Sequence, residues 1–360
     1  MPNKEVLKLH HKSFIVDGHA DTFSKILSAK SPGYQYGPHK SQMSDFFQRI
    51  PKAKAGKFTH SHMDYHRTRQ GGTNLQFMAV YTPPTYTGLE ATAYALKMVF
   101  EVLQAVRQSS LGLDSRLRGN NGLVVVKSSA DLTDLIRRDG MGFLINIEGG
   151  NPLNKDLGLL KVFYDLGVRA MGLTHNPRND LGDGIGIKYP KGLTTFGKTV
   201  VKEMNRLGML IDVAHLAKPG FRDVIRLSRG PIISSHTGVR ALRDIPRNLD
   251  DEQIKEICRR KGVMGVFYLP DYLKKFSNKK NSATVKDVVN HIQYIADKFG
   301  VDYVGLGSDW DGYGGITYGL EDCSYLHNIT AELAHRGFNQ TEIKKILGGN
   351  FVRVIKQILR

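Results

Sequence analysis

The sequence predicts an α/β fold, a (β/α)8 TIM barrel, and three observations lead to this fold class. Eight short apolar runs recur along the 360 residues, and most are separated by stretches with the apolar spacing of amphipathic helices. Side chains that can bind a metal follow six of the eight runs, and catalytic groups of such a barrel stand at the C-terminal strand ends. No repeat beyond the βα unit is visible, so we expect a single domain over residues 1–360.

The eight apolar runs are the candidate strands. Strands that alternate with helices favour a parallel sheet, and a count of eight favours closure into a barrel. The predicted strands span 14–18, 75–81, 143–147, 168–173, 209–213, 231–235, 263–268 and 303–307. The predicted helices span 89–108, 130–138, 156–166, 194–207, 217–228, 250–260 and 284–299.

Three segments fall outside this alternation. Residues 28–72 are too long for a plain connection between the first two strands, and we expect them to contribute to a substrate lid. Residues 109–122 are polar and basic with turn residues, which indicates an exposed insertion without chemistry. From Asn339 onward the chain has the apolar stripe of a helix lying on the barrel, broken near Gly348-Gly349.

Composition bounds the class of protein. A hydrophobic content of 41% and a charged content of 24% are typical of soluble globular proteins, and no apolar run approaches the ~20 residues of a membrane span. Cys258 and Cys323 are too few for a disulfide framework, and residues 1–8 lack the apolar core of a secretion signal. We therefore expect a cytoplasmic protein that does not enter a membrane.

The formal net charge of +17 raises the question of a nucleic-acid partner. Residues 1–180 carry +8 and residues 181–360 carry +9, so the excess is spread evenly and forms no basic tail or arm. This pattern favours a generally basic surface over a nucleic-acid site.

The residues just after the predicted strands are the candidate functional residues. Residues two apart in an extended chain point to the same side, so His19 and Asp21 can reach one point. Because the C-terminal strand ends of a barrel meet at one mouth, we expect the other strand-end side chains to join them. These side chains are Tyr81, Glu148, His175, His215, His236, Tyr268 and Asp309.

Three of the histidines and three carboxylates form a candidate metal-binding set: His19, His215, His236, Asp21, Glu148 and Asp309. One Zn²⁺ takes three protein ligands and a water, so six groups suit two ions that share a bridging carboxylate. Two such metals, ~3.5–4 Å apart, hold a hydroxide between them and polarise a carbonyl. Glu148 is the natural bridge, and Asp309 is then the proton carrier between the attacking water and a leaving nitrogen.

The chain resembles the membrane (renal) dipeptidase family of metallopeptidases, in motifs that follow in order over nearly its whole length. The motifs are Asp17-Gly18-His19-Ala20-Asp21, Asn146-Ile147-Glu148-Gly149-Gly150, Leu173-Thr174-His175-Asn176, Ile211-Asp212-Val213-Ala214-His215, Ser234-Ser235-His236, Arg247-Asn248-Leu249-Asp250-Asp251 and Gly305-Leu306-Gly307-Ser308-Asp309-Trp310-Asp311-Gly312. The resemblance implies an amidohydrolase-type barrel with two divalent metal ions. Zn²⁺ is the expected metal, and Mn²⁺ is the alternative. The resemblance also suggests a homodimer.

The resemblance also implies roles for single residues. It assigns His19 and Asp21 to one zinc, His215 and His236 to the other, and Glu148 to both. Asp309 would be the acid/base residue. The implied substrate-binding residues are His175, which would stabilise the oxyanion or hold the substrate, Arg247, which would grip the free carboxylate of a dipeptide, and Tyr268. Without a secretion signal or anchor pattern, the chain resembles the bacterial cytoplasmic branch.

The predicted function is hydrolysis of the peptide bond of small dipeptides, including those with a D-residue at the C-terminal position, by a hydroxide held between the two metals. One alternative is another amidohydrolase, acting on N-acyl amino acids or β-lactams. A second alternative, from a different class, is a basic nucleic-acid-binding or scaffold protein on an inactive barrel.

Three further motifs have simpler explanations. Gly192–Thr199 matches the P-loop pattern, but no buried strand precedes it, and Thr194 is better explained as the N-cap of a helix. His60, His62, His66 and Asp64 indicate a solvated helical face rather than a metal cluster. The Asp309-x-Asp311-Gly312 pattern lacks the glutamate of a calcium loop.

Overall fold

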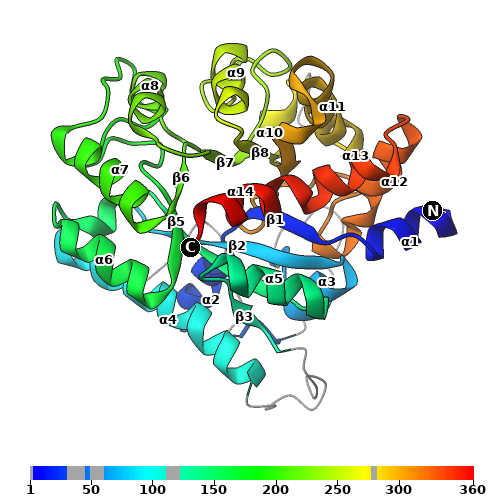
Figure 1. Cartoon of the computed structure of the whole chain (residues 1–360), viewed down its shortest axis with the longest axis horizontal. Coiled ribbons are helices and arrows are strands. Elements are labelled where there is room, and N and C mark those ends of the chain that lie inside the picture. The colour runs from blue at the N-terminus through cyan, green and yellow to red at the C-terminus, as the bar shows by residue number, and fades with distance from the viewer. Residues whose placement is uncertain (1–2, 31–44, 49–60, 111–121, 277–281) are drawn as a thin grey trace.

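Nine parallel strands build the sheet, and eight of them close into a barrel. The computed structural model describes residues 3–30, 45–48, 61–110, 122–276 and 282–360 (Figure 1). Neighbouring strands follow the order β2-β1-β9-β8-β7-β6-β5-β4-β3, and a further pairing of β2 with β4 closes the ring. The strands are β1 (Ile15–Ala20), β2 (Thr73–Tyr81), β3 (Val124–Val125), β4 (Gly142–Glu148), β5 (Val168–Gly172), β6 (Leu210–Asp212), β7 (Ile233–Thr237), β8 (Val263–Val266) and β9 (Val304–Leu306).

This architecture confirms the predicted (β/α)8 barrel, and each of the eight predicted strands corresponds to one strand of the ring. The two-residue strand β3 was not predicted. It pairs only with the start of β4, as Val124 with Gly142 and Val125 with Phe143, and lies outside the ring. So short a segment has no periodicity that a sequence pattern can reveal.

Helices surround the ring (Figure 1). They are α1 (Lys4–His11), α2 (Thr22–Lys30), α3 (Tyr65–Gln70), α4 (Gly88–Ser110), α5 (Ser129–Arg138), α6 (Leu157–Leu166), α7 (Thr195–Leu207), α8 (Lys218–Leu227), α9 (Asp251–Arg259), α10 (Pro270–Leu273), α11 (Val285–Phe299), α12 (His327–His335), α13 (Gln340–Lys344) and α14 (Asn350–Ile358). The seven predicted helices correspond to α4 to α9 and α11. Thr194 is the N-cap of α7, as predicted, and its hydroxyl accepts the backbone N–H of Gly197 at 3.0 Å.

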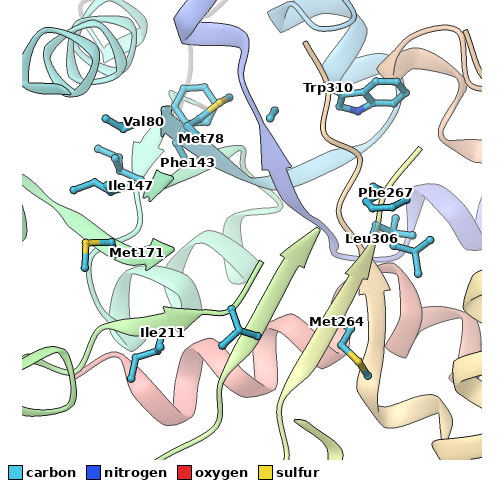
Figure 2. Close-up of a cluster of buried hydrophobic side chains, with 14 of the residues drawn as sticks. Met78, Val80, Phe143, Ile147, Met171, Ile211, Met264, Phe267, Leu306 and Trp310 are labelled. Atoms are coloured by element: carbon cyan, nitrogen blue, oxygen red, sulfur yellow. The ribbon is translucent and has the colours of Figure 1, made fainter. Parts of the chain in front are cut away.

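Apolar side chains that leave the strands form the larger core beneath these helices. Figure 2 shows Met78, Ile147, Met171, Ile211 and Met264 projecting from five strands of the barrel (β2, β4, β5, β6 and β8), and all are at most 3% exposed. Burial of this kind is the main favourable term in folding. It packs helices such as α4, α7 and α11 against the ring and leaves the strand ends as the place for polar groups.

The C-terminal helix α14 closes the N-terminal end of the barrel. A smaller core joins Val16, Leu144 and Leu210, near the starts of their strands, to Phe351 of α14. A Cβ atom on Gly18 would lie 2.8 Å from the Phe351 ring, so glycine is required at that contact. The predicted break near Gly348-Gly349 is a single π-helical turn (Lys345–Gly349) between α13 and α14.

The two unusual segments lie largely outside the described residues. The predicted lid includes 31–44 and 49–60, and the predicted insertion includes 111–121, none of which is described. Of their described parts, Phe46 is buried with its ring 5.3 Å from that of Phe143, and Ser109 is buried and accepts the N–H of Leu123.

The expectation of a solvated helical face at His62 and Asp64 is wrong. These side chains are 2% and 0% exposed, because the segment that precedes α3 packs against the loop after β9; His60 lies outside the described residues. Within the part of the chain that the structure describes, no helix combines the length and the apolarity needed to cross a bilayer.

Candidate metal centre and active site

All five predicted metal ligands meet at the C-terminal mouth of the barrel. They come from β1, β4, β6 and β7 or the residues directly after them, and each is less than 9% exposed. Three overlapping sets have ligand atoms within 4.8 Å of one another, and Asp309, which follows β9, joins one of them. The sets are His19, Asp21 and Glu148; Glu148, His215 and His236; and His19, His236 and Asp309.

Glu148 lies between two groups of ligands. Its Oε1 is 3.1 Å from Nε2 of His215 and 3.4 Å from Nε2 of His236. Its Oε2 is 3.6 Å from Nε2 of His19, and that nitrogen is 3.4 Å from Oδ2 of Asp21. One carboxylate therefore faces both sides of the site, each side through its own oxygen.

Two buried aspartates fasten the strand ends that carry the histidines. Asp17 Oδ1 accepts the backbone N–H of His19 at 3.1 Å and that of Ser308 at 2.9 Å, which joins β1 to the loop after β9. Asp212 Oδ1 accepts the N–H of Ser235 at 2.9 Å and so joins β6 to β7. These backbone positions set where the neighbouring imidazoles can point.

Neighbouring polar groups orient two of the imidazoles. Nδ1 of His215 donates to Oδ1 of Asn176 at 2.7 Å, and Nδ1 of His236 lies 2.8 Å from the hydroxyl of Ser235. A hydrogen bond at one ring nitrogen decides what the other can do. In both residues it leaves Nε2 directed at Glu148.

The electrostatics of the site follow from burial and charge. Burial lowers the pKa of both His215 and His236 well below the ordinary value, with a contribution from Arg247, so the two rings are neutral. Burial opposes ionisation of Glu148, but His19, His215 and His236 together outweigh it and hold the pKa of Glu148 well below its usual range. Burial, with Asp21 and Glu148, raises the pKa of Asp309 well above its usual range, against the effect of His19.

The residues fit a pair of divalent metal ions. Nδ1 and Nε2 of His19 and Oδ1 of Asp21 are buried and have no hydrogen-bond partner among the described residues. Buried polar atoms without partners are rare in folded proteins, and metal coordination is one way to satisfy them. Neutral imidazoles and carboxylates are the ligands that zinc and similar divalent metals take.

The predicted substrate residues His175 and Arg247 stand beside this cluster. The His175 ring centroid is 4.3 Å from that of His215 and 4.6 Å from that of Tyr81. Nη2 of Arg247 lies 3.2 Å from Nε2 of His215 and donates to the carbonyl oxygen of His236 at 2.8 Å. A hydrogen-bond donor and a cation therefore adjoin the candidate metal ligands.

Tyr268 lies deeper than these two residues. Its side chain is completely buried, with its ring edge-on to Trp310 at 5.1 Å between centroids. Its hydroxyl has no hydrogen-bond partner among the described residues. The structure thus packs Tyr268 against Trp310, and the Tyr268 N–H donates to the carbonyl of Ser308 at 3.1 Å, in the loop after β9.

Reasoning from the sequence missed the residues that orient the candidate ligands. Asp17 and Asp212 each precede a ligand histidine by two or three positions, and Asn176 and Ser235 each adjoin a strand-end histidine. All four stand within the motifs quoted above, so a polar residue close to a strand-end histidine was the available signal.

Comparison with known proteins agrees with this geometry. The family model described as membrane dipeptidase (peptidase family M19) matches residues 3–360. Dipeptidase verJ of Clonostachys rogersoniana is 30% identical over 301 residues, which cover 83% of this chain and 76% of the relative. Dipeptidase tcpJ of Claviceps purpurea is 27% identical over 338 residues, which cover 92% of this chain and 77% of the relative.

Solved structures of similar proteins share the fold. The crystal structure of dipeptidase AC, described as a metallo-peptidase of family M19, has a TM-score of 0.80 at 25% identity and covers 97% of this chain and 99% of its own. A metallo-peptidase from Rhodobacter sphaeroides, liganded with a phosphinate mimic of the dipeptide L-Ala-D-Ala, has a TM-score of 0.81 at 24% identity, with 96% of this chain and 99% of its own covered.

The match of the family model over almost the whole sequence agrees with the barrel and with the ligand cluster at its mouth. It confirms the resemblance inferred from the strand-end motifs. The chain belongs to the membrane dipeptidase family, peptidase family M19, and is a metallo-dipeptidase of that family.

Proposed function

We propose that this dipeptidase works with two divalent metal ions, Zn²⁺ by preference, bridged by Glu148. The observation that carries the proposal is the position of Glu148, one oxygen of which faces His19 while the other faces His215 and His236. A carboxylate that bridges two ions presents its oxygens in this way. His19 and Asp21 would hold one ion, and His215 and His236 the other.

Bound there, the two ions would activate a water molecule for attack and polarise the scissile carbonyl. The surrounding side chains would transfer the proton and stabilise the developing negative charge. Asp309, whose pKa burial raises, is suited to accept a proton from the attacking water and deliver it to the leaving nitrogen. His175 would donate to the oxygen that becomes negative during attack, which is the task of a fixed donor beside the reacting carbonyl.

Arg247 would recognise the substrate's free carboxylate. It is 5% exposed and held by the carbonyl of His236, with its guanidinium 5.5 Å from the Phe267 ring centroid. A guanidinium prepared in this manner binds a carboxylate through two parallel hydrogen bonds. We retain Tyr268 as a residue of the pocket wall, because its ring supports Trp310.

The substrate class is a small dipeptide, and we propose that the C-terminal position accepts a D-residue. The test is metal content per chain by elemental analysis together with a panel that includes Ala-Ala, Ala-D-Ala, an N-acetyl amino acid and a β-lactam. Two metals per chain and turnover of the dipeptides support the proposal, and faster turnover of Ala-D-Ala supports the D-residue. Turnover of the N-acetyl amino acid or the β-lactam without the dipeptides would overturn it.

Two expectations stay predictions, a cytoplasmic location and a homodimer. The nucleic-acid-binding alternative is not carried forward, because the chain belongs to an enzyme family and its six metal-competent groups converge.

A further inference from the structure

The loop after β9 is tied to the end of β1 by its backbone. Asp309 donates its N–H to the carbonyl of His19 at 3.1 Å, and Asp21 donates its N–H to the carbonyl of Trp310 at 2.7 Å. The loop that carries the proposed proton carrier is thus in register with the strand end that carries two proposed ligands. Any shift of this loop moves Asp309 relative to Asp21.

The same loop has a backbone conformation that side-chain-bearing residues rarely adopt. Asp309 has φ 65° and Asp311 has φ 69°, both in the left-handed region. Such residues persist where the surrounding structure holds them, and they gather at functional sites. The question is which contacts hold this turn.

The side chain of Asp311 is fixed by four donors from two distant segments. Thr22 Oγ1 donates to Oδ2 at 2.7 Å and Lys25 Nζ to Oδ1 at 3.0 Å, both from α2. Ser61 Oγ donates to Oδ2 at 2.5 Å and the backbone N–H of His62 to Oδ1 at 2.6 Å. Asp311 is 2% exposed, so solvent does not compete for these bonds.

The backbone of Asp311 takes part as well, because its N–H donates to Nδ1 of His62 at 3.0 Å. Burial alone would favour the neutral carboxyl, but Lys25 and His62 hold the pKa of Asp311 below its ordinary value. Asp311 is therefore a charged carboxylate, and the hydrogen bonds that both of its oxygens accept hold the turn in place.

Gly312, the next residue of this turn, contacts the carboxylates of Asp309 and Asp21. A Cβ atom at residue 312 would lie less than 3.0 Å from Oδ1 of Asp309 and from Oδ2 of Asp21. The backbone of Gly312 therefore packs directly against both carboxylate groups, where only glycine leaves them room.

We propose that Asp311 and Gly312 are positioning residues of the active site: Asp311 holds the left-handed turn after β9, and Gly312 limits where the carboxylates of Asp309 and Asp21 can stand. The proposal rests on the proposed roles of Asp309 and Asp21. The proposed role of each residue is exercised through Asp309 and Asp21 and not on the substrate itself.

The chain offers a matched pair of variants as the test, Gly312→Ala and Gly314→Ala. A Cβ on Gly314 meets nothing within 4 Å, and neither glycine has a positive φ. The atoms that Gly312→Ala displaces are the ends of two side chains, so the fold can yield by moving them. We expect Gly314→Ala to match the wild type, and Gly312→Ala to lower kcat at least 10-fold, since displacement of about 1 Å can cost ~100-fold.

The visible absorption of cobalt(II)-loaded protein is the second measurement, because it reports ligand geometry without turnover. We expect Gly312→Ala, and not Gly314→Ala, to change this spectrum. The same kcat, KM and cobalt spectrum in both alanine variants would overturn the positioning role of Gly312. If the wild type hydrolyses no dipeptide, the proposed function fails, and the cobalt spectra still decide whether Gly312 positions Asp21.

Asp311→Asn tests the anchor. It keeps the size of the side chain but removes the negative charge that Lys25 Nζ and the backbone N–H of His62 face. We expect kcat to fall at least 10-fold, KM to change less than threefold, and the double variant Lys25→Met/Asp311→Asn to recover part of kcat. Unchanged kcat in folded Asp311→Asn, or a loss expressed only in KM, would overturn the anchoring role.

Discussion

The hydroxyl of Ser235 lies 2.8 Å from Nδ1 of His236, whereas the hydroxyl of the adjacent Ser234 has no hydrogen-bond partner among the described residues. Both side chains are fully buried on β7. The pair therefore allows the orientation of a proposed ligand imidazole to be tested separately from the mere presence of a buried hydroxyl at this strand end.

Replacement of Ser235 by alanine should weaken zinc binding about 10-fold or more, because the partner that orients the His236 ring is lost. Ser234→Ala removes a hydroxyl that orients no ligand and should leave zinc affinity near the wild-type value. Competition with a chromogenic chelator measures both. Equal affinities for the two variants would show that the Ser235 contact does not orient His236.

Asp309→Asn should lower kcat by a factor of about 10² to 10⁴, because an amide cannot carry the proton, while both metals stay bound. Elemental analysis of the purified variant, alongside kinetics, tests the two halves separately. Since Asp309 also lies within ligand distance of His19 and His236, loss of one metal equivalent would instead identify it as a ligand.

Arg247→Ala should raise KM for dipeptides about 10- to 100-fold, the value of a hydrogen-bonded charge pair, and should have little effect on dipeptide amides. The comparison of each dipeptide with its amide controls for disturbance of the nearby His215, because such disturbance affects both substrates alike. If KM for the free dipeptide does not change, Arg247 does not bind the carboxylate.

Stability should fall in mild acid because of His10, a buried residue of α1. Nδ1 of His10 is 2.7 Å from the hydroxyl of Thr330, and Nε2 donates to the carbonyl of Gly71 at 2.8 Å. Burial lowers the pKa of His10 from 6.5 to about 4. His10 therefore becomes protonated below pH 6.5 in the unfolded chain but only below about pH 4 in the folded chain.

The contribution of His10 to the free energy of unfolding is complete above pH 6.5 and is lost as the pH falls from 6.5 to about 4, by about 3 kcal/mol in total. Urea denaturation of metal-stripped protein at several pH values measures it. His10→Gln should be less sensitive to pH in this window than the wild type. The exposed neighbour provides the control, and His11→Gln should keep the wild-type dependence. Parallel pH profiles for His10→Gln and the wild type would contradict the assignment.

Local patterns in the sequence were enough for the secondary structure of the barrel. The apolar runs reflect strands that are buried on both faces, and the helical periodicities reflect helices that bury one face, so both patterns can be read in the sequence. The features that the sequence did not predict are a very short strand and a residue that is buried by a segment distant in the sequence. The strand Val124–Val125 exists only through β4, and His62 is buried only because the loop after β9 packs against it.

The sequence by itself determined that there would be eight strands and that six of them would carry metal-competent groups at their ends, because strand order and residue type are both written along the chain. Only the tertiary structure decided how these groups meet. Closure of β2 onto β4 brings Glu148 to His19, and contacts between remote segments, such as Asp311 with Lys25, set the turn beside Asp309. Such contacts depend on distances across the closed barrel, and no periodicity along a single segment records them.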